Sequence, residues 1–128
     1  MNVVDSSAWL EYFADGPNAS FFGPVIEKTA DLVVPSLTLY EVFKRILQQR
    51  GEDSALRAVA AMQQATVANL DAAVALRAAK ISVEHKLPMA DSVIFATAQI
   101  HDATLWTQDA DFESFPGVRY RKRQPPSE

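Results

Sequence analysis

The sequence predicts an α/β fold, namely a three-layer α/β/α sandwich with a central, mostly parallel sheet. Short apolar runs alternate with longer segments whose apolar residues recur at helical spacing. Strands that alternate with helices imply parallel pairing through helical crossovers. The predicted strands are also short and nearly all apolar, as expected for a sheet that helices cover on both faces.

The strands follow from apolar runs bounded by turn residues. The run at 32–34 stops at Pro35, as a buried strand often does, and Thr and Val favour a strand at 66–70. The last strand is expected at an edge of the sheet. The full set is 2–5, 32–34, 66–70, 104–107 and 118–120.

The helices follow from turn signals and capping residues. Residues 15–17, Asp-Gly-Pro, end the first helix, and Pro88 opens the last. Asn18, Ser36 and Asp71 are expected N-caps, because their side chains can accept hydrogen bonds from free backbone N–H groups. The expected helices are 6–13, 18–26, 36–49, 54–64, 72–85 and 88–101.

Composition fits one compact domain, expected to span residues 1–123 and to be followed by a loose tail at 124–128. There is no Cys, which excludes disulfides and thiolate-held zinc. We see no signal peptide, and no apolar run approaches the roughly 20 residues of a membrane helix, so a cytoplasmic location without membrane contact is expected. The net charge of −4 does not suit a protein that coats duplex nucleic acid.

Two acidic residues stand where predicted strands end. Asp5 is at the C-terminal end of the first strand, and Asp109 lies two residues beyond the strand at 104–107. Taken alone, Asp5 is more simply a helix N-cap and Asp109 a turn residue. In a parallel sheet, however, both would project from the same edge, where ligand sites of such folds lie.

Two further acids lie on predicted helices. Glu41 has apolar neighbours on nearly every side, so burying it unpaired would cost several kcal/mol. A metal ion or a basic partner would remove that cost, and Lys44 and Arg45 are the nearest basic partners on its helix. Asp91 lies in the first turn of a helix that is apolar almost all round. There the helix dipole favours a negative charge, whether or not a metal is bound.

Several carboxylates in one pocket repel one another unless divalent cations lie between them. With no Cys and little His, oxygen ligands point to Mg²⁺ or Mn²⁺. Basic residues gather at Lys44, Arg45 and Arg50 and again at 119–123. The sequence does not decide whether these clusters contact phosphates or are solvated surface.

Four segments, taken in order, resemble PIN-domain ribonucleases, specifically the VapC-type toxins of toxin–antitoxin modules. The resemblance covers nearly the whole chain, and it departs only where many relatives carry Gly before the late strand and this chain has His101-Asp102-Ala103. The segments are 3–7, 39–42, 90–98 and 105–112.

The resemblance implies a PIN-like fold and a catalytic, metal-binding quartet at Asp5, Glu41, Asp91 and Asp109. Thr107 matches a hydroxyl position beside the quartet. Asp111 ranks lower as an assisting acid, and Lys44 and Arg45 are candidates for RNA contact. The family also implies a homodimer and an antitoxin whose tail covers the active site. Apolar residues on the predicted helices 18–26 and 36–49 also favour a homodimer, since one small core does not need them all.

The resulting hypothesis is a magnesium-dependent endoribonuclease that acts as the toxin of such a pair. A metal ion would activate the attacking water, with Asp5 and Asp91 as direct ligands. One alternative is a metal-dependent phosphatase or a phosphate-accepting receiver domain, but a receiver needs a Lys near the last strand and none lies close to Thr107. The other is a catalytically silent domain that only binds a protein partner.

Overall fold

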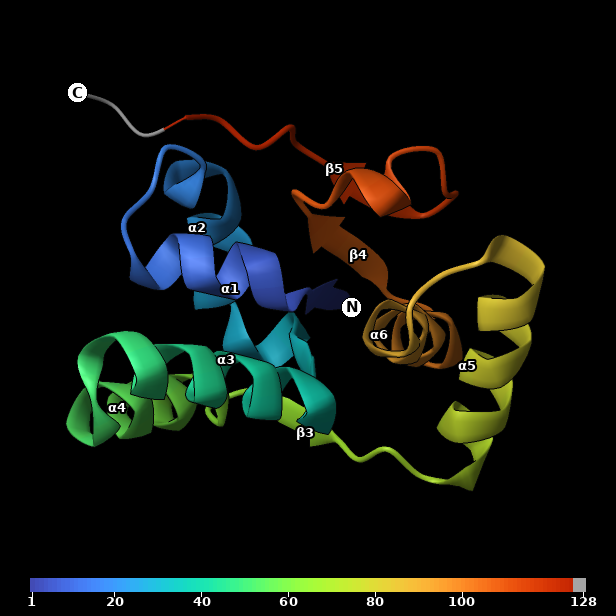
Figure 1. The fold of residues 1–128 in the computed structure, drawn as a ribbon, viewed down its shortest axis with the longest axis horizontal. Coiled ribbons are helices and arrows are strands. Elements are labelled where there is room, and N and C mark those ends of the chain that lie inside the picture. The colour runs from blue at the N-terminus through green and yellow to red at the C-terminus, as the bar shows by residue number, and fades with distance from the viewer. Residues whose placement is uncertain (126–128) are drawn as a thin grey trace.

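The computed structural model describes residues 1–125 (Figure 1). Its strands are β1 (Asn2–Val4), β2 (Val33–Pro35), β3 (Thr66–Ala68), β4 (Thr104–Thr107) and β5 (Val118–Tyr120). Its α-helices are α1 (Ser6–Phe13), α2 (Ala19–Glu27), α3 (Ser36–Arg50), α4 (Glu52–Met62), α5 (Ala72–His85) and α6 (Met89–Ile100). Short 3₁₀ turns, η1 (Thr29–Asp31) and η2 (Ala110–Phe112), precede β2 and follow β4.

All strand pairs are parallel, as the alternation of strands and helices predicted. β4 lies between β1 and β5, and β2 pairs with β3. A parallel bridge between Asn2 and Leu32 joins the two groups in the order β3-β2-β1-β4-β5. The strand at 118–120 lies at the edge, which confirms the prediction for it.

Helices cover both faces of this sheet, so the three-layer prediction is confirmed. Neighbouring residues of a strand point to opposite faces. Val3 therefore packs with the α5 and α6 side of the core, and Val4 packs with the α1 to α4 side. Figure 1 shows α5 and α6 on one side of the molecule and α1, α3 and α4 on the other.

Helix α6 is largely buried, because every residue from Ser92 to Ala98 is buried. Its Phe95 packs in a stacked arrangement against Phe112 and edge-on against Phe115, both of which lie beyond β4. The helix is thereby fixed against the segment that follows β4. Both elements contribute carboxylates to the site described below.

Two of the three predicted N-caps are wrong. The side chain of Asn18 does not cap α2: its Oδ1 accepts no hydrogen bond from the described residues, and its Nδ2 donates to Gln108 Oε1 and to the Lys122 carbonyl, each at 3.0 Å. Ser36 does not cap α3 either, because its Oγ accepts a hydrogen bond from the Leu70 N–H. The third cap is confirmed, since Asp71 accepts from the Val74 N–H at 3.0 Å.

Helix α4 begins and ends two residues earlier than predicted. Its first turn holds Glu52 and Asp53, whose negative charges the helix dipole favours at that end. Residues 124 and 125 of the predicted tail have no regular secondary structure, and 126–128 lie outside the described residues. Within the described residues, no helix is both long and apolar enough to span a bilayer.

The predicted excess of apolar surface is present on α3 but not on α2. Phe22 is fully buried, and Phe21 is half-buried against the ring of Trp106, so the part of the prediction that rested on α2 is wrong. On α3, Tyr40 and Leu47 are exposed, and they line an apolar hollow together with Phe43.

Candidate metal centre

The first two acids lie at one edge of the sheet, because β1 and β4 are parallel neighbours. Val4 is in register with Trp106, so Asp5 and Thr107 follow side by side at the carboxyl ends of the two strands. Asp109 comes two residues later, as the residue before η2. This is the edge where ligand sites of parallel α/β sheets lie.

Asp5 is buried, and both oxygens of its carboxylate accept hydrogen bonds. Oδ1 accepts from Ser7 Oγ at 2.8 Å and from the Ala8 N–H at 3.0 Å. Oδ2 accepts from Thr107 Oγ1 at 2.5 Å. Asp5 therefore does cap α1, as its simplest interpretation held. Since a carboxylate offers roughly four lone-pair positions, the three hydrogen bonds fix its orientation and leave room for a cation.

Thr107 links Asp5 to the loop that carries Asp109. Its Oγ1 donates to Asp5 and accepts from the Asp109 N–H at 2.9 Å. Asp109 Oδ1 in turn accepts from the Asp111 N–H at 2.9 Å, which closes a tight turn after β4. Asp109 is therefore a turn residue, as its simplest interpretation held, and it also lies at the site. The turn determines the positions of both Asp109 and Asp111.

Asp91, Asp109 and Asp111 form a cluster, with one carboxylate oxygen of each within 4.8 Å of the other two. Asp91 comes from the first turn of α6, and the other two come from the turn after β4. The sequence ranked Asp111 below the quartet; in the structure it lies in the same cluster as Asp109, but it is exposed whereas Asp109 is half-buried.

Glu41 reaches the site from α3. Its Oε1 accepts a hydrogen bond from Ser6 Oγ at 2.5 Å, which ties it to the start of α1 beside Asp5. Among the described residues, it forms no salt bridge with Lys44 or Arg45, the basic partners that its own helix offered. Lys44 instead lies over the exposed ring of Tyr40, 5.6 Å from its centre.

The burial and the mutual repulsion of these acids shift the pKa values of Asp91 and Asp5. Burial and, after it, the charges of Asp109, Asp5, Asp111 and Glu41 in this order together raise the pKa of Asp91 from its ordinary 3.8 to about 7. Burial also raises the pKa of Asp5 to about 6, against the opposing effect of its three hydrogen bonds. Because four other carboxylates act on Asp91, all five acids share one local field.

This arrangement fits a divalent cation. In the described part of the chain, no Lys, Arg or His forms a salt bridge with any of the five acids, so their mutual repulsion is not relieved by the protein. A cation held by Asp91, Asp109 and Asp111 would relieve it, and these three carboxylates could hold a metal ion. Carboxylate oxygens are the ligands that Mg²⁺ and Mn²⁺ prefer.

The hydroxyl donors Ser6 and Ser7 are the residues that sequence reasoning missed. Each hydrogen-bonds a different acid, Ser6 to Glu41 and Ser7 to Asp5. Their position directly after Asp5 was the available signal, since small hydroxyl residues at a helix start often bind a nearby carboxylate or backbone group.

Comparison with known families identifies the domain that carries this site. The model of the PIN domain family matches residues 3–118, which is most of the chain. The chain belongs to the PIN domain family. The match includes every acid of the site, so the site lies within the PIN domain itself. A search of curated protein sequences finds no match.

Solved structures of similar fold cover nearly the whole chain. A toxin–antitoxin complex from Klebsiella pneumoniae matches with a TM-score of 0.79 at 24% identity, over 93% of this chain and 96% of that one. Mycobacterium tuberculosis VapC20, a toxin that cleaves the sarcin–ricin loop, matches with a TM-score of 0.77 at 18% identity, over 91% and 95%. FitAcB from Neisseria gonorrhoeae matches with a TM-score of 0.60 at 25% identity, over 94% and 96%.

Proposed function

We propose that this PIN-domain protein is a magnesium-dependent endoribonuclease and acts as the toxin of a toxin–antitoxin pair. The observation that carries the proposal is the gathering of five carboxylates without a basic partner at the carboxyl edge of the sheet. The fold similarity to VapC20, whose substrate is a loop of RNA, supports RNA as the substrate class.

The contacts of the site residues suggest a separate role for each of them. Asp5 and Asp91 are assigned as direct metal ligands, and Glu41 and Asp109 bind the metal directly or orient its water molecules. Bound Mg²⁺ lowers the pKa of a water molecule and stabilises charge on the phosphoryl group during phosphodiester hydrolysis. Thr107 holds Asp5 in a fixed orientation by donating to its Oδ2. Asp111 joins Asp91 and Asp109 at the outer side of the group, where it is exposed to solvent.

Lys44 and Arg45 are assigned to hold the RNA backbone near the site. Both are exposed and lie one turn beyond Glu41 on α3, and both line a hollow that includes Glu41 itself. Their charges would attract phosphates toward the acids once the metal is bound.

The deciding experiment is cleavage of a mixed RNA pool by the purified chain without any partner protein. We expect endonucleolytic products in Mg²⁺ and none in EDTA. The Asp102→Asn variant is the control, because Asp102 is exposed in a left-handed turn (φ 50°) that Asn also adopts readily, so it should cleave like the wild type. Intact RNA after incubation with folded wild type and Mg²⁺ would favour the silent, protein-binding alternative.

We also propose that a small partner protein inhibits this site. The five acids form a group of like charges when no metal is bound, and a guanidinium can bind carboxylates bidentately in competition with metal. The similar toxin–antitoxin complexes support a partner of this kind. A partner tail whose basic residues are changed to Ala should still bind through apolar contacts but inhibit poorly. Full inhibition by that tail would show that the acids are not its target.

A homodimer is proposed on the exposed apolar side chains of α3, chiefly Tyr40 and Leu47. Exposed groups of this kind often mark an interface between protein chains. Light scattering at micromolar concentration should give twice the 14.1 kDa chain mass. A monomer mass would contradict the proposal.

A further inference from the structure

Two adjoining hollows lie on the side of the molecule formed by α1 and α3. The first, of about 240 Å³, runs between α1, the second half of α3 and the chain that follows β4. The second, of about 220 Å³, extends it toward α4 and shares Phe13, Ile46 and Arg50 with it. The two adjoining hollows are together called the channel below.

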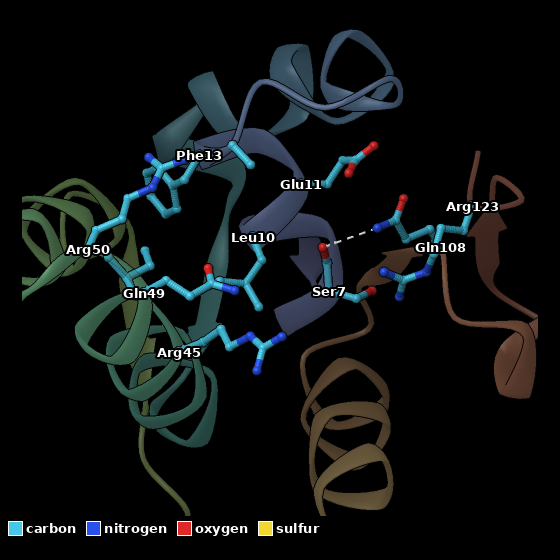
Figure 2. A pocket seen from close by; sticks show the side chains of 11 residues that line it. Ser7, Leu10, Glu11, Phe13, Arg45, Gln49, Arg50, Gln108 and Arg123 are labelled. Carbon is cyan, nitrogen blue, oxygen red and sulfur yellow. Dashed lines mark hydrogen bonds between the residues drawn. The ribbon is translucent and has the colours of Figure 1, made fainter. Parts of the chain in front are cut away.

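Arginines line this channel along its length. Arg45, Arg50 and Arg123 border the first hollow, and Arg57 borders the second beside Arg50. Figure 2 shows Arg45 and Arg50 reaching α1 from one side and Arg123 reaching it from the other. In the part of the chain that the structure describes, none of the four forms a salt bridge.

One carboxylate also lines the first hollow, that of Glu11. Its Oε2 accepts a hydrogen bond from the Asn18 N–H at 2.7 Å, so it is bound within the turn between α1 and α2. In Figure 2 its carboxylate points away from Arg45 and Arg50. The positive charges of these two arginines therefore face the channel without a partner from the protein.

The first hollow lies near the acidic site, although none of the five acids lines it. Ser7 and Gln108 line its first hollow, and Gln108 Nε2 donates to the Ser7 carbonyl at 3.4 Å (Figure 2). Ser7 also donates to Asp5, and Gln108 lies between Thr107 and Asp109 in the sequence. Ser7 and Gln108 therefore connect the acidic site to the first hollow.

We propose that Arg45, Arg50, Arg57 and Arg123 form a track for the backbone phosphates of single-stranded RNA beyond the scissile bond. The inference rests on the nuclease function proposed above. A cation among the acids neutralises only the phosphate that it contacts, so the next phosphates along the strand would be repelled by five carboxylates. Arginines spaced along the channel offset that repulsion, and their planar guanidinium groups suit phosphate oxygens.

The chemistry of the channel favours RNA over a protein segment. Between the arginines, Gln49 and Gln108 present amide groups, whereas the separate hollow on α3 and α4 is lined mainly by Leu39, Phe43 and Leu47. Leu10, Phe13 and Ile46 also line the channel, but its arginines and amide groups match a nucleic-acid backbone, whereas an apolar hollow matches apolar side chains.

The test measures binding of a single-stranded RNA oligonucleotide, with Ca²⁺ in place of Mg²⁺ to limit cleavage. The variant Arg50→Gln/Arg57→Gln removes two charges from the far end of the track. The control Arg77→Gln/Lys80→Gln removes two from α5, on the other side of the sheet. We expect the first variant to lose roughly tenfold in affinity at low salt, and the slope of log K against log salt to shrink by about 1.4, or about 0.7 for each phosphate released.

A second measurement identifies the phosphates concerned. Uncharged methylphosphonate linkages placed one to four nucleotides from the cleavage position should weaken binding to the wild type. They should weaken binding to Arg50→Gln/Arg57→Gln less, because the contact is already lost. Circular dichroism of both variants establishes that they are folded.

An RNA affinity and salt slope like those of the wild type would overturn the proposal. So would loss of affinity for the inhibitory partner alone, which would mean that the channel holds an acidic protein segment. Release of RNA by inorganic phosphate at an equal concentration of phosphate groups would also contradict it, because a track requires connected phosphates. Cleavage of bis(p-nitrophenyl) phosphate by the wild type tests the metal centre separately, so a failed nuclease assignment would not be mistaken for a failed track.

Discussion

The acidic site and the arginine channel are two concentrations of like charge that adjoin one another but are held very differently. The acids are fixed by the fold: Asp5 accepts three hydrogen bonds, and Asp109 is held in a turn that Thr107 closes. The arginines are exposed at the ends of long side chains. The first region is rigid and partly desolvated, and the second is flexible and hydrated.

This difference indicates what each region can do. Fixed, partly buried carboxylates bind a small cation with defined geometry, because the cost of bringing the charges together is met during folding. Hydrated arginines contribute a few tenths to about 1 kcal/mol each and tolerate many positions of a ligand. Substitutions in the acidic site should therefore have severe and specific effects on cleavage. Substitutions in the channel should have mild and nearly additive effects on RNA binding.

The largest effect is expected from removing single carboxylates. Asp5→Asn, Glu41→Gln and Asp91→Asn should each lower the RNA cleavage rate by more than the roughly 100-fold upper end that is typical of groups supporting a metal's ligands. The reason is that one lost charge disturbs a site shared by five acids. Initial rates on a labelled RNA measure this, with Asp102→Asn as the control. Near-normal rates in all three variants would refute the assignment.

A smaller effect is expected from Thr107→Val, which keeps the shape of the side chain and removes the hydroxyl. Asp5 Oδ2 would lose its donor and the Asp109 N–H its acceptor. We expect metal affinity to fall by about 10- to 100-fold, with cleavage restored at high Mg²⁺. Isothermal titration with Mn²⁺ and the Mg²⁺ dependence of the rate measure both effects. Thr107→Ser, which retains the hydroxyl, should stay close to the wild type.

Metal binding should also stabilise the folded chain. At a concentration 100 times its dissociation constant, Mg²⁺ or Mn²⁺ adds about 2.7 kcal/mol to the free energy of unfolding by mass action. Asp91→Asn should raise the melting temperature without metal, because it removes a partly buried charge from four like charges, and should lose the metal-induced shift. Equal metal-induced shifts in wild type and variant, measured by thermal denaturation, would argue against the site.

The pH dependence of the metal-free protein tests the same repulsion. The pKa values of Asp5 and Asp91 rise from 3.8 to about 6 and about 7 on folding, so the native state binds these protons more tightly. Their contribution to stability is therefore complete below about pH 4 and is lost as pH rises to about 7. In EDTA, the melting temperature of the wild type relative to Asp91→Asn should fall over this range. A relative rise would contradict it.

The smallest effects are expected at Lys44 and Arg45, which the sequence treated as equivalent. Arg45 borders the channel, whereas Lys44 lies over the Tyr40 ring. Arg45→Gln should therefore weaken RNA binding by about threefold to fivefold, and Lys44→Gln by less, as expected for single exposed charges. Fluorescence anisotropy with a short RNA measures the difference. A larger loss of RNA affinity for Lys44→Gln than for Arg45→Gln would indicate that the RNA lies on the other side of α3.

Much of the fold was predictable because its signals are local. The strands at 104–107 and 118–120 and the helices at 6–13 and 72–85 have the predicted bounds, since caps, turns and apolar runs lie within each segment. The failures lie where a distant group competes for a side chain. Asn18 donates to Gln108, 90 residues away, and Ser36 accepts from Leu70, 34 residues away, so both side chains bond to distant groups and not to their own helix.

The candidate site was likewise predicted in part from the sequence and in part seen only in the tertiary structure. Asp5, Glu41, Asp91 and Asp109 were predicted as a group from strand ends, from a charge in an apolar segment and from the family resemblance, and parallel pairing of β1 with β4 brings the strand-end acids to one edge. Only the tertiary structure shows that Asp111 belongs with Asp91 and Asp109, and that arginines from α3, α4 and the segment after β5 line one channel. Those neighbours depend on how the turn after β4 and the faces of the helices are packed. A linear pattern records which residues have the right chemistry, whereas packing decides which of them meet.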